Sequence, residues 1–158
     1  MELDSEYEYL MKKLGIKGLA VSEFKKAFNV TPLKGIRSYS NQKYASMGNS
    51  ALHLLLSELL FDAKDDNRAY KDDLFEYESY DNWINTYNTF DLKKYVYSND
   101  GNVYDGFVVQ SSLFEAIAGI IFINQGYNSL KNWYEDFISI NQEKLIKNNI
   151  KIINSFSY

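Results

Sequence analysis

Residues 41–56 decide the fold: Asn41-Gln42-Lys43-Tyr44-Ala45-Ser46-Met47-Gly48-Asn49-Ser50-Ala51-Leu52-His53-Leu54-Leu55-Leu56. From Asn49 onward, leucines at 52, 55, 56, 59 and 60 recur with the spacing of one helical face. This pattern predicts a core-facing amphipathic helix that follows Gly48 and is capped by Asn49 or Ser50. A second segment, Gln110-Ser111-Ser112-Leu113-Phe114-Glu115-Ala116-Ile117-Ala118-Gly119, predicts another apolar helix that starts at Ser111 and ends near Gly126.

The rest of the chain also has helical patterns and no convincing strand alternation, so the predicted class is all-α. Turn signals are Pro32 with Gly35 and the polar run 98–102, which precedes an extended-looking segment 103–109. We expect the polar run 65–73 to break the first motif helix or to form a charged loop. The remaining predicted helices cover 6–14, 23–28, one or two within 74–89, 129–140, and a fraying segment in the tail 143–158.

Length and composition favour one globular domain of 158 residues, with 46% hydrophobic and 16% aromatic side chains. The absence of cysteine excludes disulfides and thiolate metal sites. No apolar run reaches the length of a membrane span, and the acidic N-terminus resembles neither a secretory signal nor a transit peptide. We therefore expect an intracellular protein without a membrane partner, and the sequence leaves cytoplasmic, nuclear and organellar compartments open.

The two segments together resemble the ribonuclease III nuclease domain, whose signatures read N-E-R-L-E-F-L-G-D-[SA]-V-L and A-D-x-F-E-A-L-I-G-A-I-Y-L-D-x-G. The sequence 37–40, Arg-Ser-Tyr-Ser, is similar to the lead-in of the first signature, and the acid-equivalent positions 49 and 112 lie 63 residues apart, as in the family. The resemblance covers about residues 7–138. It implies the helical ribonuclease III-type endonuclease fold for residues 1–142 and a tail at 143–158 too short for a double-stranded-RNA-binding domain. Matching positions are Asn41, Gly48, Ser50 and Leu52 in the first signature, and Phe114, Glu115, Ala116, Gly119, Ile121 and Gly126 in the second.

The resemblance also implies which catalytic groups have been lost. Family members cleave RNA with Mg²⁺ held by four carboxylates, and these fall here on Ala45, Asn49, Ser112 and Glu115. Only Glu115 is an acid, and Gln42 also replaces a family acid. Since hard cations need anionic oxygen ligands, we predict that the ancestral Mg²⁺ site is lost and that the protein is a pseudoenzyme without a metal cofactor. The lone Glu115 is then expected to favour the first turn of its helix or to assist its cap.

The net charge of the chain and the residues at the family's dimer interface indicate which partners the protein could bind. The net charge is −4, so non-specific binding of duplex RNA is disfavoured, and Arg37 and Lys43 are the candidates for RNA contact. The family dimerises across the first motif helix through a large aromatic that is Ser46 here. Ser46, Met47 and His53 are therefore the candidate interface residues, in a homodimer or with another ribonuclease III-like chain. His53 has no partner at ligand spacing and is expected at the surface or in that interface.

Three functions remain open. The first is a structural or docking subunit of an RNA-containing assembly, either ribosomal or RNA-processing. The second is a regulator that partners an active ribonuclease III or binds double-stranded RNA. The third is an active endonuclease that uses displaced acids, with Glu58, Asp62 and Asp105 as candidates. Because catalysis needs closely placed groups, displaced acids seldom restore it.

Overall fold

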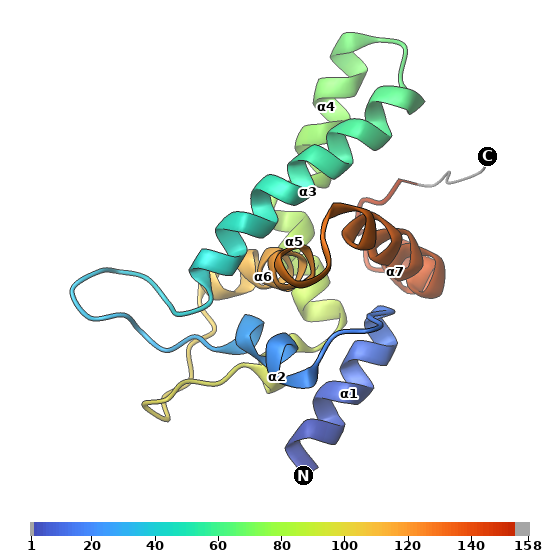
Figure 1. Ribbon diagram of the computed structural model, residues 1–158. Helices are drawn as coiled ribbons and strands as arrows, with labels where there is room; N and C mark the ends of the chain where they lie inside the picture. The colour runs from blue at the N-terminus through green and yellow to red at the C-terminus, as the bar shows by residue number, and fades with distance from the viewer. Residues whose placement is uncertain (1, 154–158) are drawn as a thin grey trace.

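A computed structural model describes residues 2–153, and they fold into seven α-helices and two short 3₁₀ helices (Figure 1). Two isolated bridges, Asn29 with Tyr97 and Pro32 with Tyr39, are the β-pairing found in this range. The all-α prediction is therefore confirmed. The elements are α1 Glu2–Leu14, α2 Val21–Phe24, η1 Lys25–Phe28, α3 Gln42–Ala63, α4 Asn67–Tyr77, α5 Tyr80–Thr89, η2 Leu92–Tyr95, α6 Phe107–Gln125 and α7 Tyr127–Lys147.

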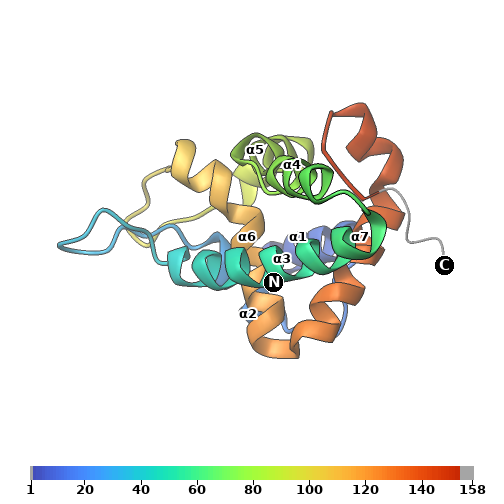
Figure 2. The ribbon, with the colours of Figure 1, turned by 90° about the horizontal axis from the view of Figure 1, so that it is seen from above.

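Helix α6 is the central element of the core. It packs against α3, α5 and α7, and the two views show these helices arranged around it (Figures 1 and 2). Most of its side chains are buried, including the run from Ser111 to Ile121. By length and composition α6 is apolar enough to cross a membrane, but 67% of the relevant stretch is buried inside the fold. Its hydrophobicity is therefore accounted for by its place in the core.

The crossing of α3 and α6 depends on two glycines. A Cβ on Gly48 of α3 would overlap the carbonyl oxygen of Glu115, and a Cβ on Gly119 of α6 would overlap the carbonyl oxygen of Tyr44. The helices therefore touch backbone to backbone at this point, which side chains larger than hydrogen do not permit. This contact brings the two motif segments together.

Several helix boundaries differ from the sequence predictions. Helix α3 begins at Gln42, so Gly48 lies inside it and neither Asn49 nor Ser50 is its cap. The polar run 65–73 follows the end of α3 at Ala63, as expected, but it also contains the start of α4. Asp66 caps α4, and its side chain accepts from the Arg68 backbone N–H at 2.8 Å. Helix α6 starts at Phe107, within the segment expected to be extended. The polar residues at 65–73 include a helix cap, and Gly48 serves close helix packing. Both residue types are also typical of loops, so the sequence alone did not locate these helix starts.

The C-terminal segment is part of the packed structure as far as it is described. Helix α7 continues to Lys147, past the expected tail boundary at 142/143. Ile150, Ile152 and Ile153 are buried, and the Lys151 backbone exchanges two hydrogen bonds with the Asn82 side chain of α5. Residues 143–153 thus complete the core against α5, where a fraying end was expected; residues 154–158 of the expected tail lie outside the described range.

Candidate functional site

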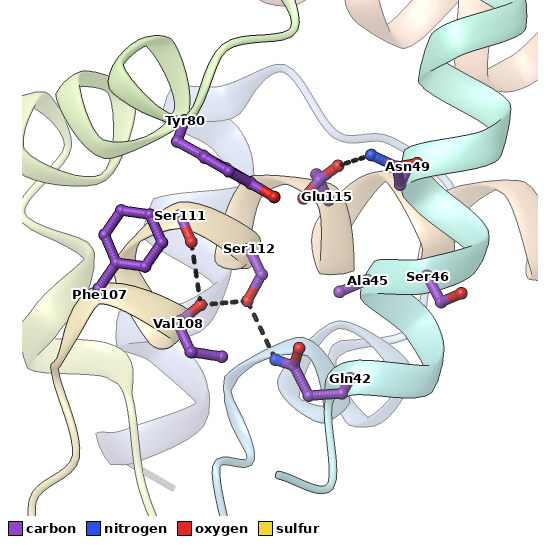
Figure 3. A pocket seen from close by; sticks show the side chains of 10 residues that line it. All are labelled: Gln42, Ala45, Ser46, Asn49, Tyr80, Phe107, Val108, Ser111, Ser112 and Glu115. Carbon is purple, nitrogen blue, oxygen red and sulfur yellow. Dashed lines mark hydrogen bonds between the residues drawn. The ribbon is translucent and has the colours of Figure 1, made fainter. Parts of the chain in front are cut away.

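The two motif segments meet in one open pocket of about 420 Å³ (Figure 3). Its walls come from α3, the N-terminal half of α6, and the start of α5. All four positions that correspond to family acids line this pocket. The full lining is Gln42, Ala45, Ser46, Asn49, Tyr80, Phe107, Val108, Ser111, Ser112 and Glu115.

Asn49 and Glu115 form a hydrogen-bonded pair across the pocket. The Asn49 Nδ2 group donates to Glu115 Oε2 at 2.5 Å, which links α3 to α6 (Figure 3). Glu115 is 6% exposed and lies in the third turn of α6, because that helix starts at Phe107. The expected role in the first turn, as a cap or dipole partner, is therefore wrong. Glu115 is instead a buried acid at the contact between two helices.

Burial raises the pKa of Glu115 to about 7, from an ordinary value of 4.5. Removal of the carboxyl from water disfavours its charged form. The hydrogen bond from Asn49 lowers the pKa, and the charge of Glu78 raises it again by a smaller amount. The pocket thus holds a single acid, and burial favours its protonated form more than in an exposed glutamate.

A second polar link holds the other end of the pocket. Gln42 Nε2 donates to Ser112 Oγ at 3.0 Å, and that hydroxyl donates to the Val108 carbonyl at 2.5 Å (Figure 3). A neutral hydrogen bond between Gln42 and Ser112 therefore joins α3 to α6 at this end of the pocket.

The residues present do not fit a divalent metal site. Within residues 2–153, no group of three or more His, Cys, Asp or Glu side chains is placed to hold a metal ion. In the pocket, Glu115 is the one carboxylate, Ala45 offers no ligand atom, and Asn49 and Ser112 offer neutral oxygens. Because Mg²⁺ dehydrates reluctantly and is held mainly by carboxylates, this donor set is too weak in charge.

The predicted interface and RNA-contact residues are surface residues with different surroundings. Arg37 is exposed in the loop before α3, and Lys43 is exposed with its Nζ 5.1 Å from the centre of the Tyr44 ring. Ser46 and Met47 are exposed on α3, and Ser46 also lines the pocket. His53 pairs through Nδ1 with Glu78 Oε1 at 2.7 Å, and Glu78 is the residue that follows α4 of the same chain.

The structure does not bring the displaced acids into the pocket. Glu58 accepts from the Tyr127 hydroxyl at 2.8 Å and pairs with Lys131, so it faces α7. Asp105 pairs with Lys93 at 2.9 Å, and Asp62 is exposed near the end of α3. None of the three lines the pocket. These three acids therefore add no carboxylate to the pocket.

Three lining residues could not be found from the motifs. They are Val108 and the pair Tyr80 and Phe107, whose rings form one wall with centroids 5.3 Å apart in an edge contact. Tyr80 belongs to α5, which has no family signature, and Phe107 was hidden in a segment expected to be extended. Only the packing of α5 beside α6 places them at the site.

The fold is that of a ribonuclease III nuclease domain. A solved structure of this domain from Campylobacter jejuni matches with a TM-score of 0.68 at 22% sequence identity, covering 92% of this chain and 97% of that chain. A second structure, concerned with flexibility in the region involved in dimer formation of the same nuclease domain, gives 0.67 and 21%, covering 89% and 96%. No protein-family model and no curated protein matches the sequence. The likeness to solved structures establishes the fold that the two motifs predicted.

The raised pKa of Glu115 predicts a specific pH dependence of stability. The folded state binds this proton more tightly than the unfolded chain, so the linked stabilisation is complete below about pH 4.5 and is lost as pH rises through about 7. At about 1.4 kcal/mol per pKa unit, the loss is at most about 3 kcal/mol. Glu115→Gln removes this dependence, so its free energy of unfolding relative to wild type rises between pH 5 and pH 8 in urea titrations.

Glu58→Gln is the matched control on α3. Its hydrogen bonds from Tyr127 and Lys131 lower the pKa of Glu58, so this group is ionised in both states between pH 5 and 8. Its difference from wild type should stay constant over that range. Parallel pH profiles for wild type and Glu115→Gln would contradict a raised pKa at Glu115.

Proposed function

We propose that this protein is a catalytically inactive domain with the ribonuclease III nuclease fold, which serves as a structural or docking subunit of an RNA-containing assembly such as a ribosome or an RNA-processing complex. One observation carries the proposal: Glu115 is the one carboxylate lining the pocket in which the family holds its metal. The fold is kept around a site whose donor set no longer suits that metal.

The charge balance supports the loss of chemistry. With Asn49, Ser112 and Ala45 in place of acids, the pocket carries three fewer negative charges than a four-carboxylate site. The remaining Glu115 has a pKa of about 7, and its Oε2 atom already accepts a hydrogen bond from the Asn49 side chain. Metal activation of water, and stabilisation of a leaving oxygen, both require a bound dication. The pocket therefore lacks the electrostatics for phosphodiester cleavage through that route.

The proposal predicts no Mg²⁺- or Mn²⁺-dependent cleavage of double-stranded RNA by the purified protein. The measurement is a gel assay of a labelled duplex, run with wild type and Glu115→Ala in parallel. Equal, background-level signals are expected, because there is no metal-bound nucleophile to remove. Metal-dependent turnover in wild type that Glu115→Ala abolishes would show that the domain is an active nuclease.

An exposed apolar stripe on α3 supports the docking role. Met47, Leu54 and Phe61 are all exposed and are spaced by seven residues, so they lie along one side of the helix. Exposed apolar side chains that recur along one side of a helix mark a surface that another chain can cover. The net charge of −4 also favours a protein over free RNA as the direct partner. The same stripe supports a second candidate function, a regulatory partner of an active nuclease of this fold.

The apolar stripe predicts that the protein associates with another chain through α3. Light scattering measures the molar mass and so the oligomeric state of the purified protein. If a second copy covers the stripe, wild type forms a dimer and Leu54→Glu shifts the equilibrium toward monomer, because a carboxylate would be buried against apolar side chains. Val103→Glu is the matched control, since Val103 is an exposed apolar residue outside α3. A wild-type monomer would contradict the homodimer, and equal effects of both variants would contradict the role of α3.

A further inference from the structure

A second hollow continues from the pocket along α4 and α5. It has a volume of about 540 Å³ and shares Asn49, Tyr80 and Phe107 with the first pocket. The two hollows therefore adjoin at these residues, and together they are here called the site groove. Its additional lining residues are Phe75, Glu78, Ser79 and Asp81.

The site groove is acidic along its length. Glu115 lies at one end, with Glu78 and Asp81 at the other, and no lysine or arginine lines either hollow in the described part of the chain. Glu78 is paired with His53, whereas Asp81 forms no ion pair within residues 2–153. Two acceptor atoms, Glu115 Oε1 and Asn49 Oδ1, have no hydrogen-bond donor among the described residues. The groove thus has negative charge and unused acceptors.

Three exposed aromatic rings border the same groove. Phe75 is 76% exposed, Tyr80 62% and Phe107 59%, and the last two contact each other edge to face. Such exposure is costly for rings that could pack in a core. Aromatic faces beside carboxylates suit cations, because the face of the ring is negative and attracts guanidinium and ammonium groups.

We propose that the site groove binds a basic segment of a protein partner, and that an arginine or lysine side chain of this segment inserts into the pocket toward Glu115. The inserted group would meet Glu115 Oε1 and Asn49 Oδ1 as acceptors, and Tyr80 as an aromatic wall. Glu78 and Asp81 would repel the phosphate groups of RNA, so a basic protein fits better than a nucleic acid. The inference rests on the proposed function, since a metal held by Glu115 would compete with the cation.

A fluorescein-labelled oligo-arginine peptide is the probe, and fluorescence anisotropy measures its affinity at low salt. We expect Asp81→Asn, Tyr80→Ala and Glu115→Gln each to weaken binding by about fivefold or more, the size of one cation–π or charge-assisted contact. Asp65→Asn and Tyr9→Ala are matched controls, because both residues are exposed and line neither hollow. These controls remove the same charge as Asp81→Asn and the same aromatic side chain as Tyr80→Ala. The affinity of each control for the peptide should stay within about twofold of wild type.

Three results would overturn the inference. Absence of binding by wild type contradicts it, and so do equal effects of Asp81→Asn and Asp65→Asn, which indicate non-specific attraction to an acidic protein. An effect of Asp81→Asn without any effect of Glu115→Gln overturns the insertion of a side chain into the pocket.

Magnesium separates this inference from the proposed function. Millimolar MgCl₂ should weaken peptide binding no more than NaCl of the same ionic strength, because the pocket lacks a metal site. Displacement by MgCl₂ beyond that screening, lost in Glu115→Gln, would show a metal in the pocket and refute the proposed function. Absence of peptide binding, with no sign of bound Mg²⁺, would refute the groove inference alone.

Discussion

The backbone contact between α3 and α6 is the constraint on which the rest of the structure depends. Gly48 and Gly119 each leave room for a carbonyl oxygen of the opposite helix, and a methyl group at either place would collide with backbone. Backbone cannot move aside as a flexible side chain can, so the crossing point and the register of the two helices are fixed together. The central helix α6 then positions α5 and α7 around the core (Figure 2).

The same crossing builds the pocket, whether or not a metal is bound. It brings Asn49 beside Glu115 and Gln42 beside Ser112, in each case across the two helices. In a four-carboxylate site, a cation must offset repulsion between acids at this distance. Here neutral hydrogen bonds join the helices, and burial shifts the one remaining acid toward its neutral form. The fold is thus compatible with a pocket that needs no cation for its stability.

Two surfaces of the domain differ in chemical character. The stripe of Met47, Leu54 and Phe61 is apolar and runs along α3, whereas the site groove combines acids with exposed rings. An apolar helix face suits another helix, and an acidic aromatic groove suits a cationic segment. Both surfaces favour protein contacts over contacts with RNA phosphates, in agreement with the net charge of −4.

The fold and the meeting of Asn49 with Glu115 could be predicted from the sequence, because both motif segments are present in order and at the right distance. The helix starts could not. Gly48 indicated a helix start, but it lies inside α3 and allows close packing against α6. Glu115 lies in the third turn of α6 because that helix begins at Phe107, which the sequence pattern did not predict. Tyr80 and Asp81 reach the groove through the packing of α5, which leaves no local pattern in the sequence.

The most direct measurement is the binding of Mn²⁺ to the purified protein, followed by the loss of the free-ion signal in electron paramagnetic resonance. Wild type should leave Mn²⁺ free up to millimolar concentration, because Glu115 alone cannot hold a dication. The triple substitution Ala45→Glu, Asn49→Asp and Ser112→Asp restores the missing acids on the same backbone and should bind Mn²⁺ if it remains folded by circular dichroism. Tight binding by wild type that Glu115→Gln removes would contradict the loss of the metal site.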